Sequence, residues 1–297
     1  MQTWLIFGVS GQFGRFMAEF FLRHGKNVIG ISRSQPAKEL MQNKRFSYFQ
    51  GDGTKKLSKE ALQAVQSADV IMFSVPIALT EVCIQKVGPL LRAGQLITDV
   101  TSVKQRPVEA MLNSVSEEVE ILGMHPLFSP TLTLENKNVI LVPERIAREK
   151  LQEVVAMFED DKAKVSIMTA KEHDHMMAVM QGLAHFLFLA LGKTLSERKW
   201  KFAEYEDKKT TFYTLVKSLL DRVVSFDPAL YAEIQLYNPQ VPEVLSHFLE
   251  DAETLKEFIV QGEEKKLKKN LESIQKAVKT DDDIVEKTNA MYSLLEE

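Results

Sequence analysis

Cysteine is almost absent from this sequence: Cys83 is the only one in 297 residues. A lone cysteine cannot close an intrachain disulfide or build a cysteine-rich metal site, which excludes a disulfide-stapled secreted fold and fits a reducing compartment. Long apolar runs are absent too, since no stretch approaches the ~18–20 uninterrupted apolar residues of a membrane-spanning helix. The sequence therefore predicts a protein without a membrane span.

Positive charge is not in excess either. The net charge of −4 argues against nucleic acid or an acidic membrane surface as the main partner. The N-terminus lacks the cationic segment of a signal peptide, so we expect a cytoplasmic protein. An anionic substrate would have to be held by a few local cations. The length and the ordinary composition are typical of a globular protein of two domains.

The first half of the chain alternates β-rich runs with helical patterns. Several runs, such as Val70–Phe73, are continuously apolar, as in strands covered on both faces. The alternation predicts an α/β fold for residues 1–168, with a mostly parallel, doubly wound sheet of the Rossmann type. The predicted strands are Thr3–Phe7, Asn27–Ser32, Phe46–Gln50, Asp69–Val75, Leu96–Val100, Glu118–Met124, Val139–Val142 and Lys164–Met168, and the predicted helices are Phe13–His24, Ser58–Ser67, Leu79–Leu91 and Ala147–Phe158.

No strand pattern follows Met168. Residues from Ala170 to about Glu197 form one long, mostly apolar helical pattern, and three or four further helical segments follow. Because so apolar a helix is usually buried, we expect it to run through a core or a dimer interface. Residues 169–297 are therefore predicted to form a second, all-helical domain.

A glycine-rich turn joins the first predicted strand to the first helix. Gly8, Gly11 and Gly14 have the spacing G-x-x-G-x-x-G. Gly8 permits a tight turn, Gly11 lets a pyrophosphate approach the backbone, and Gly14 lets the helix pack closely on the strand. The helix N-terminus then offers N–H groups and a positive dipole end to phosphates. In this strand–turn–helix context the motif predicts a dinucleotide site rather than an ordinary turn.

The end of the second predicted strand bears on the choice of dinucleotide. An NAD site usually places a carboxylate about 20 residues after the glycines, for the ribose 2′-hydroxyl. This chain has Ser32, Arg33 and Ser34 there. Hydroxyls and a guanidinium can donate to a 2′-phosphate, which a carboxylate would repel. The sequence predicts NADP as the preferred cofactor and NAD as the alternative, unless Arg33 is simply a solvated loop residue.

Five segments together carry a family resemblance. They are Asp99–Lys104, Gly123–Phe128, Glu172–Asp174, Gln181–Phe186 and Asp227–Ile234. In this order they resemble the prephenate dehydrogenase family of tyrosine biosynthesis, in particular the dehydrogenase domain alone of its archaeal-type and bifunctional bacterial members. The resemblance covers nearly the whole chain. It implies oxidative decarboxylation of prephenate, a small dicarboxylate, to 4-hydroxyphenylpyruvate, and a homodimer formed through the helical substrate domain.

The resemblance also implies roles for single residues. The catalytic histidine of the family falls on His125, just after a predicted strand, where a histidine can accept a hydroxyl proton because its unperturbed pKa is ~6.5. Ser102 matches the serine that hydrogen-bonds this histidine beside the nicotinamide. Arg222 matches the arginine that binds a substrate carboxylate, and His185 matches a histidine facing the active cleft.

Structural roles remain open for the same residues. Ser102 could cap the helix that follows, Arg222 could pair with Asp221, and His185 could be a satisfied core histidine. The predicted cofactor-binding residues, taken together, are Gly8, Ser10, Gly11, Gln12, Phe13, Gly14, Ser32, Arg33, Ser34, Ser74, Val75, Pro76 and Thr101.

No metal site is predicted. His173 and His175 stand two residues apart, so on a helix they point to different faces and are poorly arranged for one ion. Glu172–Asp174 is interpreted instead as a structural or cofactor-side motif at the start of the long helix.

Two departures from the family pattern affect the choice of substrate. Ser129 stands where glycine is usual, and Thr211-Phe212 stands where many members have Ser-Pro. Arogenate and 4-amino-4-deoxyprephenate are therefore alternative substrates within the same chemistry.

Two other protein classes share the predicted architecture. A 3-hydroxyacid or imine reductase would need an interdomain lysine, and Lys171 and Lys193 lack the surrounding motif of those enzymes. A nucleotide-sensing regulator would have no need for His125, Ser102 and Arg222 together.

Overall fold

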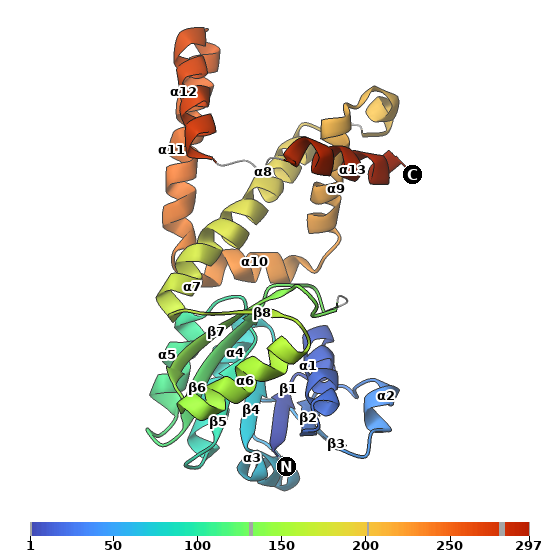
Figure 1. The fold of residues 1–297 in the computed structure, drawn as a ribbon, viewed down its shortest axis with the longest axis vertical. Coiled ribbons are helices and arrows are strands. Elements are labelled where there is room, and N and C mark those ends of the chain that lie inside the picture. Colours follow the sequence, from blue (N-terminus) through green and yellow to red (C-terminus); the bar gives the residue numbers. More distant parts are fainter. Residues whose placement is uncertain (1, 131–132, 201, 279–282, 297) are drawn as a thin grey trace. The chain divides into compact units, whose positions relative to one another are not determined.

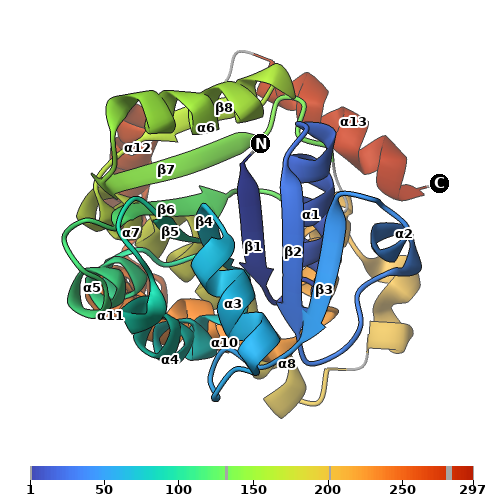
Figure 2. The ribbon, with the colours of Figure 1, turned by 90° about the horizontal axis from the view of Figure 1, so that it is seen from below.

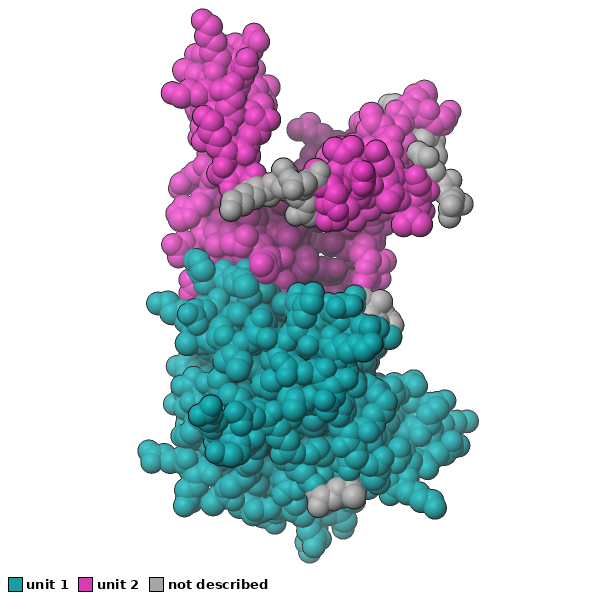
Figure 3. Space-filling view, viewed as in Figure 1, with its two compact units in different colours: residues 1–177, 233–239 teal, residues 178–232, 240–297 magenta. Residues whose placement is uncertain are grey.

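The computed structural model describes residues 2–130, 133–200, 202–278 and 283–296. The chain divides into two compact units, coloured separately in Figure 3. The first unit comprises Met1–Met177 and Glu233–Pro239, and the second comprises Ala178–Ala232 and Gln240–Glu297.

The first unit is built on one eight-stranded sheet in the order β3-β2-β1-β4-β5-β6-β7-β8 (Figure 1). Neighbouring strands are parallel except for the antiparallel pair β6 and β7. The doubly wound, mostly parallel sheet is confirmed. Its strands are β1 (Thr3–Phe7), β2 (Asn27–Ser32), β3 (Phe46–Gln50), β4 (Val70–Phe73), β5 (Leu96–Asp99), β6 (Glu120–Pro126), β7 (Asn138–Arg145) and β8 (Lys164–Ile167).

Helices cover both faces of this sheet (Figure 2). They are α1 (Gln12–Arg23), α2 (Lys38–Met41), α3 (Lys59–Ser67), α4 (Ile77–Val87), η1 (Gly88–Leu90), α5 (Gln105–Ser114) and α6 (Arg148–Asp160), while α7 (Ala170–Met177) follows the last strand. Residues of α1 and α6 share one apolar cluster with the sheet, and residues of α3, α4 and α5 share another.

Strand β1 explains why the central strands are mostly apolar. Trp4 and Ile6 belong to the cluster with α1 and α6, whereas Leu5 and Phe7 belong to the opposite cluster. Successive side chains of a strand point to opposite faces, and both faces are covered, so the four buried positions of β1 are all apolar. The ring of Trp4 stacks on Phe21 of α1 with centroids 3.8 Å apart.

Strand β6 extends further than the sequence pattern indicates. Its antiparallel pairing with β7 continues past Met124, so that His125 pairs with Ile140 and Pro126 with Val139. His125 therefore lies within the end of the strand rather than after it. The neighbouring strand supplies backbone partners that the local sequence does not reveal.

The second unit is all-helical, and no strand follows β8 in the described residues. A π-helical segment, η2 (Ala178–Leu183), continues α7 into α8 (Ala184–Glu197), so the predicted single helix exists with a π-helical stretch inside it. The other helices are η3 (Phe202–Lys208), α9 (Thr211–Val224), α10 (Pro228–Tyr237), α11 (Val241–Val260), α12 (Glu264–Ala277) and α13 (Ile284–Glu296). The end of α10, from Glu233, belongs to the first unit.

The long apolar helix is not buried within one chain. No residue of α8 is buried, and only 17% of the most apolar window of Ala170–Glu197 is covered. By length and composition, this is the one described helix that could cross a membrane. A helix that packs against a second subunit has the same composition, so this property alone is weak evidence for a membrane span.

Candidate active site

The glycine-rich turn has the geometry of a phosphate-binding loop. Gly8 adopts a φ of +85°, and its N–H donates to the carbonyl oxygen of Ile31 at 2.8 Å. A Cβ on Gly8 would stand 2.1 Å from the oxygen of Ser74, and a Cβ on Gly14 would stand 2.1 Å from the oxygen of Gly8. The fold itself therefore requires glycine at both positions.

Gly11 differs from the other two glycines. A Cβ there would meet only the oxygen of Gly8, at 3.3 Å, and its φ of −74° suits any residue. Packing does not require glycine at this exposed position, but a ligand that approaches the backbone would. Gly11 is also the N-cap of α1, which no side chain caps. The free first-turn N–H groups fit the pyrophosphate of a dinucleotide.

A cavity of about 270 Å³ opens beside this turn, at the carboxyl ends of β1 to β4. Gly8, Ser10, Gly11, Ser32, Arg33, Ser34, Ser74, Val75 and Pro76, all predicted cofactor residues, line it. The other four predicted residues, Gln12, Phe13, Gly14 and Thr101, are not in its lining. The cavity lies where the strand order reverses between β1 and β4, which is the expected place for a ligand in such a sheet.

Sequence reasoning missed one wall of this cavity. Gly51–Thr54, which follow β3, line it together with Leu79 and Cys83 of α4. The rule that carboxyl ends of parallel strands share one edge could have found the Gly51 loop. Cys83 is buried, and this burial raises the pKa of its thiol to about 12. It therefore remains an inert thiol.

The turn after β2 is hydrogen-bonded to the glycine-rich loop. The Ser32 hydroxyl donates to the oxygen of Ser34 at 2.7 Å, and the Ser34 hydroxyl donates to that of Ser10 at 3.1 Å. Arg33 is exposed between these serines. Across the cavity, hydrogen bonds from Thr54, with the nearby charges of Lys55 and Arg33, hold the pKa of Asp52 below its ordinary value. Arg33 is thus a cation at the cavity rim.

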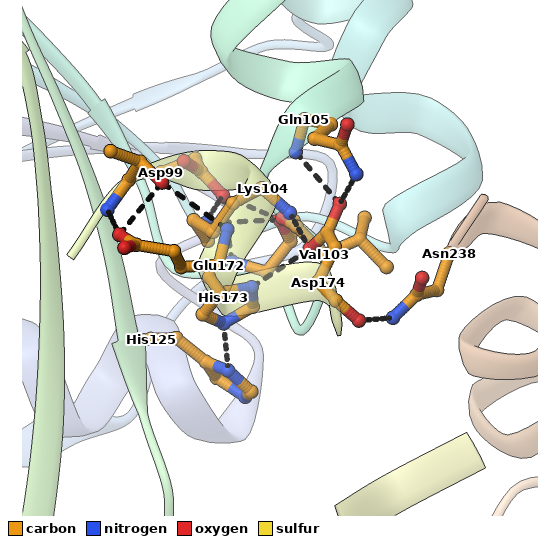
Figure 4. Close-up of polar contacts among 11 residues, drawn as sticks. Asp99, Val103, Lys104, Gln105, His125, Glu172, His173, Asp174 and Asn238 are labelled. Carbon is orange, nitrogen blue, oxygen red and sulfur yellow. Dashed lines mark hydrogen bonds and ion pairs between the residues drawn. The ribbon is translucent and has the colours of Figure 1, made fainter. Parts of the chain in front are cut away.

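A second cluster, around His125, consists of buried polar side chains (Figure 4). Nδ1 of His125 lies 2.8 Å from Nε2 of His173, and Nδ1 of His173 lies 2.8 Å from Oδ1 of Asp174. His125 is 3% exposed and the other two are fully buried. His173 and Asp174 come from α7, and His125 from the end of β6. The three side chains form a continuous hydrogen-bonded chain.

Asp174 also fixes the start of α5. Its carboxylate accepts the backbone N–H groups of Lys104 at 2.8 Å and Gln105 at 2.9 Å. These are N–H groups that a helix start otherwise leaves unsatisfied. Ser102 does not cap this helix, because the N-cap position falls on Lys104. The backbone oxygen of Asp174 accepts the side-chain amide of Asn238 at 2.8 Å.

Lys104 and Asp99 form a buried ion pair beside this chain. Both side chains are fully buried, and the hydroxyl of Thr101 also contacts Oδ2 of Asp99. Burial lowers the pKa of Lys104, and the attraction of Asp99 offsets this only in part. Oδ1 of Asp99 has no hydrogen-bond partner within the described residues.

The surroundings of His125 keep it neutral. Burial, followed by the nearby His173 and Lys104, lowers the pKa of His125 well below its ordinary value. Burial also lowers the pKa of His173, although the hydrogen bond to Asp174 acts in the opposite direction. For Asp174, burial acts to raise the pKa, but the hydrogen bonds from His173, Gln105 and Lys104 outweigh it and leave the pKa lowered. A neutral imidazole can accept a proton.

Ser102 lies in the loop between β5 and α5 and is partly buried. Within the described residues, the hydrogen bond that His125 makes is to His173 and not to Ser102. The role of Ser102 stays a prediction.

Arg222 and His185 both belong to the second unit. The guanidinium of Arg222 lies 3.8 Å above the ring of Phe226, while Asp221 pairs with Lys217 at 2.6 Å. His185 packs edge-on against Tyr231, with centroids 4.7 Å apart. Its Nδ1 is buried without a hydrogen-bond partner in the described part of the chain. Asp221 therefore does not pair with Arg222, and Nδ1 of His185 has no partner in the described residues, so both side chains remain candidates for ligand contacts.

The residues that sequence reasoning missed here are His173, Asp174, Lys104 and Asp99. The Glu172–Asp174 motif was noticed but interpreted as structural or cofactor-side. His173 is buried whereas His175 is exposed, as expected for residues on different helix faces. The 48-residue separation of His125 and His173 gives no sign in the sequence that their rings touch.

Comparisons with known proteins agree with this architecture. The sequence model described as prephenate dehydrogenase, nucleotide-binding domain, matches residues 17–167. The model described as prephenate dehydrogenase, dimerization domain, matches residues 169–273.

Individual relatives cover most of the chain. A probable arogenate/prephenate dehydrogenase of Methanocaldococcus jannaschii is 31% identical over 257 residues, which are 86% of this chain and 56% of that protein. A 4-amino-4-deoxyprephenate dehydrogenase of Streptomyces pristinaespiralis is 26% identical over 80% of this chain and 78% of its own length. The chain spans about half the length of the first two curated relatives it matches.

Solved structures share this fold. One of them is the prephenate dehydrogenase of A. aeolicus in complex with hydroxyphenyl propionate and NAD+. Its TM-score is 0.71 at 23% identity, over 93% of this chain and 96% of that chain.

The three glycines generate a testable contrast. Gly14→Ala should lower the free energy of unfolding by about 1–3 kcal/mol, because its Cβ meets backbone. Gly11→Ala should change stability by less than about 0.5 kcal/mol but weaken dinucleotide binding by roughly 10–100-fold. Urea unfolding and calorimetric titration with NADP and NAD measure the two effects. If Gly11→Ala bound both dinucleotides as tightly as the unaltered protein, the pyrophosphate could not lie against Gly11.

Proposed function

The chain belongs to the prephenate dehydrogenase family, and from this premise we propose that it oxidises and decarboxylates prephenate to 4-hydroxyphenylpyruvate. We propose NADP as its preferred cofactor, a homodimer as its assembly and the cytoplasm as its location. The observation that carries the proposal is His125, a buried neutral imidazole at the carboxyl-side edge of the sheet that also bears the dinucleotide cavity.

The residues divide the work of the reaction. The glycine-rich turn and the N-terminus of α1 would hold the pyrophosphate, and Ser32, Arg33 and Ser34 the 2′-phosphate. When bound, the nicotinamide accepts hydride from the ring carbon that bears the substrate hydroxyl. His125 takes the proton from that hydroxyl as its O–H bond breaks.

His125 also returns the proton that it accepts. Loss of the ring carboxylate as carbon dioxide leaves an aromatic phenolate, which takes the proton back from His125. Aromatisation supplies the driving force, so that the protein chiefly has to position the reacting groups. No net proton is released.

The second unit supplies candidates for substrate recognition. Arg222 offers a planar guanidinium to a substrate carboxylate, and Asp221 does not compete for it because it pairs with Lys217. The unpartnered Nδ1 of His185 offers a further polar contact. Ser129, in place of the usual glycine, leaves arogenate and 4-amino-4-deoxyprephenate as alternative substrates. The second of these is the substrate named for the Streptomyces relative.

The homodimer is supported by the exposed apolar side chains of the helical unit. Val179, Met180 and Leu187 are 44–60% exposed in the single chain. A second copy that packs along this helix would bury them, at about 25 cal/mol for each Å² removed from water.

A substrate panel tests the proposal. Prephenate, arogenate and 4-amino-4-deoxyprephenate are each offered with NAD and NADP, and reduced nicotinamide is followed by absorbance. We expect the highest kcat/KM with prephenate and NADP. A higher kcat/KM with another substrate selects that alternative. If none of the three substrates is turned over, the proposed function is wrong, although the fold assignment still holds.

Replacing His125 tests the proton acceptor. His125→Asn should lower kcat by roughly 10²–10⁴-fold, with a smaller change in KM, because a positioned base acts in the transition state. In the unaltered enzyme, kcat/KM should stay level from pH 8 down to about 6.5 and fall only below it, since the pKa of His125 is lowered and protonation blocks acceptance. A raised KM with unchanged kcat would reject this role.

Replacing Arg33 tests the cofactor preference. Arg33→Ala should raise the KM for NADP by about 10–100-fold and leave that for NAD nearly unchanged, because a charge-assisted hydrogen bond contributes about 1.5–3 kcal/mol. Lys44→Ala is the matched control, because Lys44 is an exposed cation just before the N-terminal end of β3, away from the cavity. Equal effects on both cofactors would place Arg33 outside the 2′-phosphate site.

A further inference from the structure

We propose that His173 and Asp174 are positioning residues, which hold His125 in the tautomer with Nδ1 protonated and Nε2 free to accept the substrate proton. The consequence for catalysis rests on the proposed function. The tautomer itself follows from the hydrogen-bonded chain in Figure 4.

The argument starts at Asp174, which can only accept. Its two carboxylate oxygens receive the backbone N–H groups of Lys104 and Gln105, and neither donor can reverse its role. An ionised carboxylate has no proton to give. The group 2.8 Å from Oδ1, which is Nδ1 of His173, must therefore be the donor.

The proton on Nδ1 decides what His173 offers at its other nitrogen. A neutral imidazole has one donor and one acceptor nitrogen, and burial keeps His173 neutral by lowering its pKa. Its Nε2 is consequently an acceptor. Nδ1 of His125, at 2.8 Å, has to donate to it, which leaves the lone pair of His125 on Nε2.

The hydrogen-bonded chain from Asp174 through His173 also fixes the ring of His125 in space. Both imidazoles are buried, and their planes meet at 60° with centroids 5.0 Å apart. Asp174 is tied to the start of α5 by its carboxylate and to Asn238 by its backbone oxygen. A ring held at one nitrogen by an anchored partner presents the other nitrogen in one direction.

The groups around His125 favour holding the accepted proton only briefly. When Nε2 accepts the hydroxyl proton, the bond from Nδ1 to His173 becomes charge-assisted and therefore stronger. Asp174 stands one residue further along this chain, and Asp99 partly neutralises the opposing Lys104. Burial and Lys104 still favour the neutral ring, so the imidazolium returns its proton readily.

Two substitutions of His173 test its hydrogen bonds to Asp174 and to His125 separately. An asparagine amide stands near the place of Nδ1, so His173→Asn can still donate to Asp174 but cannot reach His125. A glutamine amide stands near the place of Nε2, so His173→Gln keeps a partner for His125 but loses Asp174, and with it the bias toward one tautomer. His175→Gln, an exposed histidine on the same helix, is the control.

Nitrogen-15 NMR of the full chain labelled at its six histidines reads the tautomers without turnover. We expect a protonated Nδ1 and a free Nε2 on His125 in the unaltered protein, a mixture in His173→Gln, and loss of the Nδ1–H form in His173→Asn. We expect kcat to fall by roughly 10–100-fold in His173→Asn, part of what a positioned base contributes, with substrate KM changed less than about twofold. His173→Gln should recover part of the rate.

Two results would overturn the proposal: a proton on Nε2 of His125 in the unaltered protein, or an unchanged tautomer and kcat in His173→Asn. The first needs no variant, so it decides even if a substitution prevents folding. If the tautomer is as expected but no substrate of the panel turns over, the proposed function fails while the positioning of His125 stands.

Discussion

The carboxylate of Asp174 is the contact on which the arrangement around His125 depends. It receives two backbone N–H groups from the start of α5 and one from the ring of His173. Burying a carboxylate costs several kcal/mol unless its oxygens are fully paired. Here these three charge-assisted hydrogen bonds, with a longer fourth from the side-chain amide of Gln105 at 3.3 Å, compensate that cost. One buried charge thereby joins α7 to α5 and orients the ring that touches His125.

The parallel sheet imposes a second constraint, because it gathers functional groups at one edge. The carboxyl ends of β1 to β4 form the dinucleotide cavity, and β5 leads into the loop of Ser102 and Lys104. The antiparallel strand β7 keeps β6 extended as far as His125. The glycine-rich turn and His125 thus arise from the same edge although more than a hundred residues separate them in sequence. The fold supplies the proximity that the proposed hydride and proton transfers both require.

Local patterns were informative wherever local physics decides the structure. Strands β1 to β3 begin and end where their apolar runs predict, and Gly8 and Gly14 are glycines because backbone atoms stand where a Cβ would be. The end of β6 could not be predicted, since its last pairs depend on β7. The apolar helix was expected to run through a core or a dimer interface, and no residue of α8 is buried within the single chain. This rules out burial in a core of the single chain, and the dimer interface stays a prediction.

The glycine-rich turn and the doubly wound sheet follow from the sequence, because turn sterics and strand periodicity act over short stretches of chain. The candidacy of His125 also came from the sequence, but through the family resemblance of the segment around it. The tautomer of His125 was decided only by the tertiary structure. It depends on Asp174 receiving two backbone N–H groups about seventy residues away and on two histidine rings meeting across the fold. Hydrogen-bond direction passes from residue to residue through space, and no spacing along the chain encodes it.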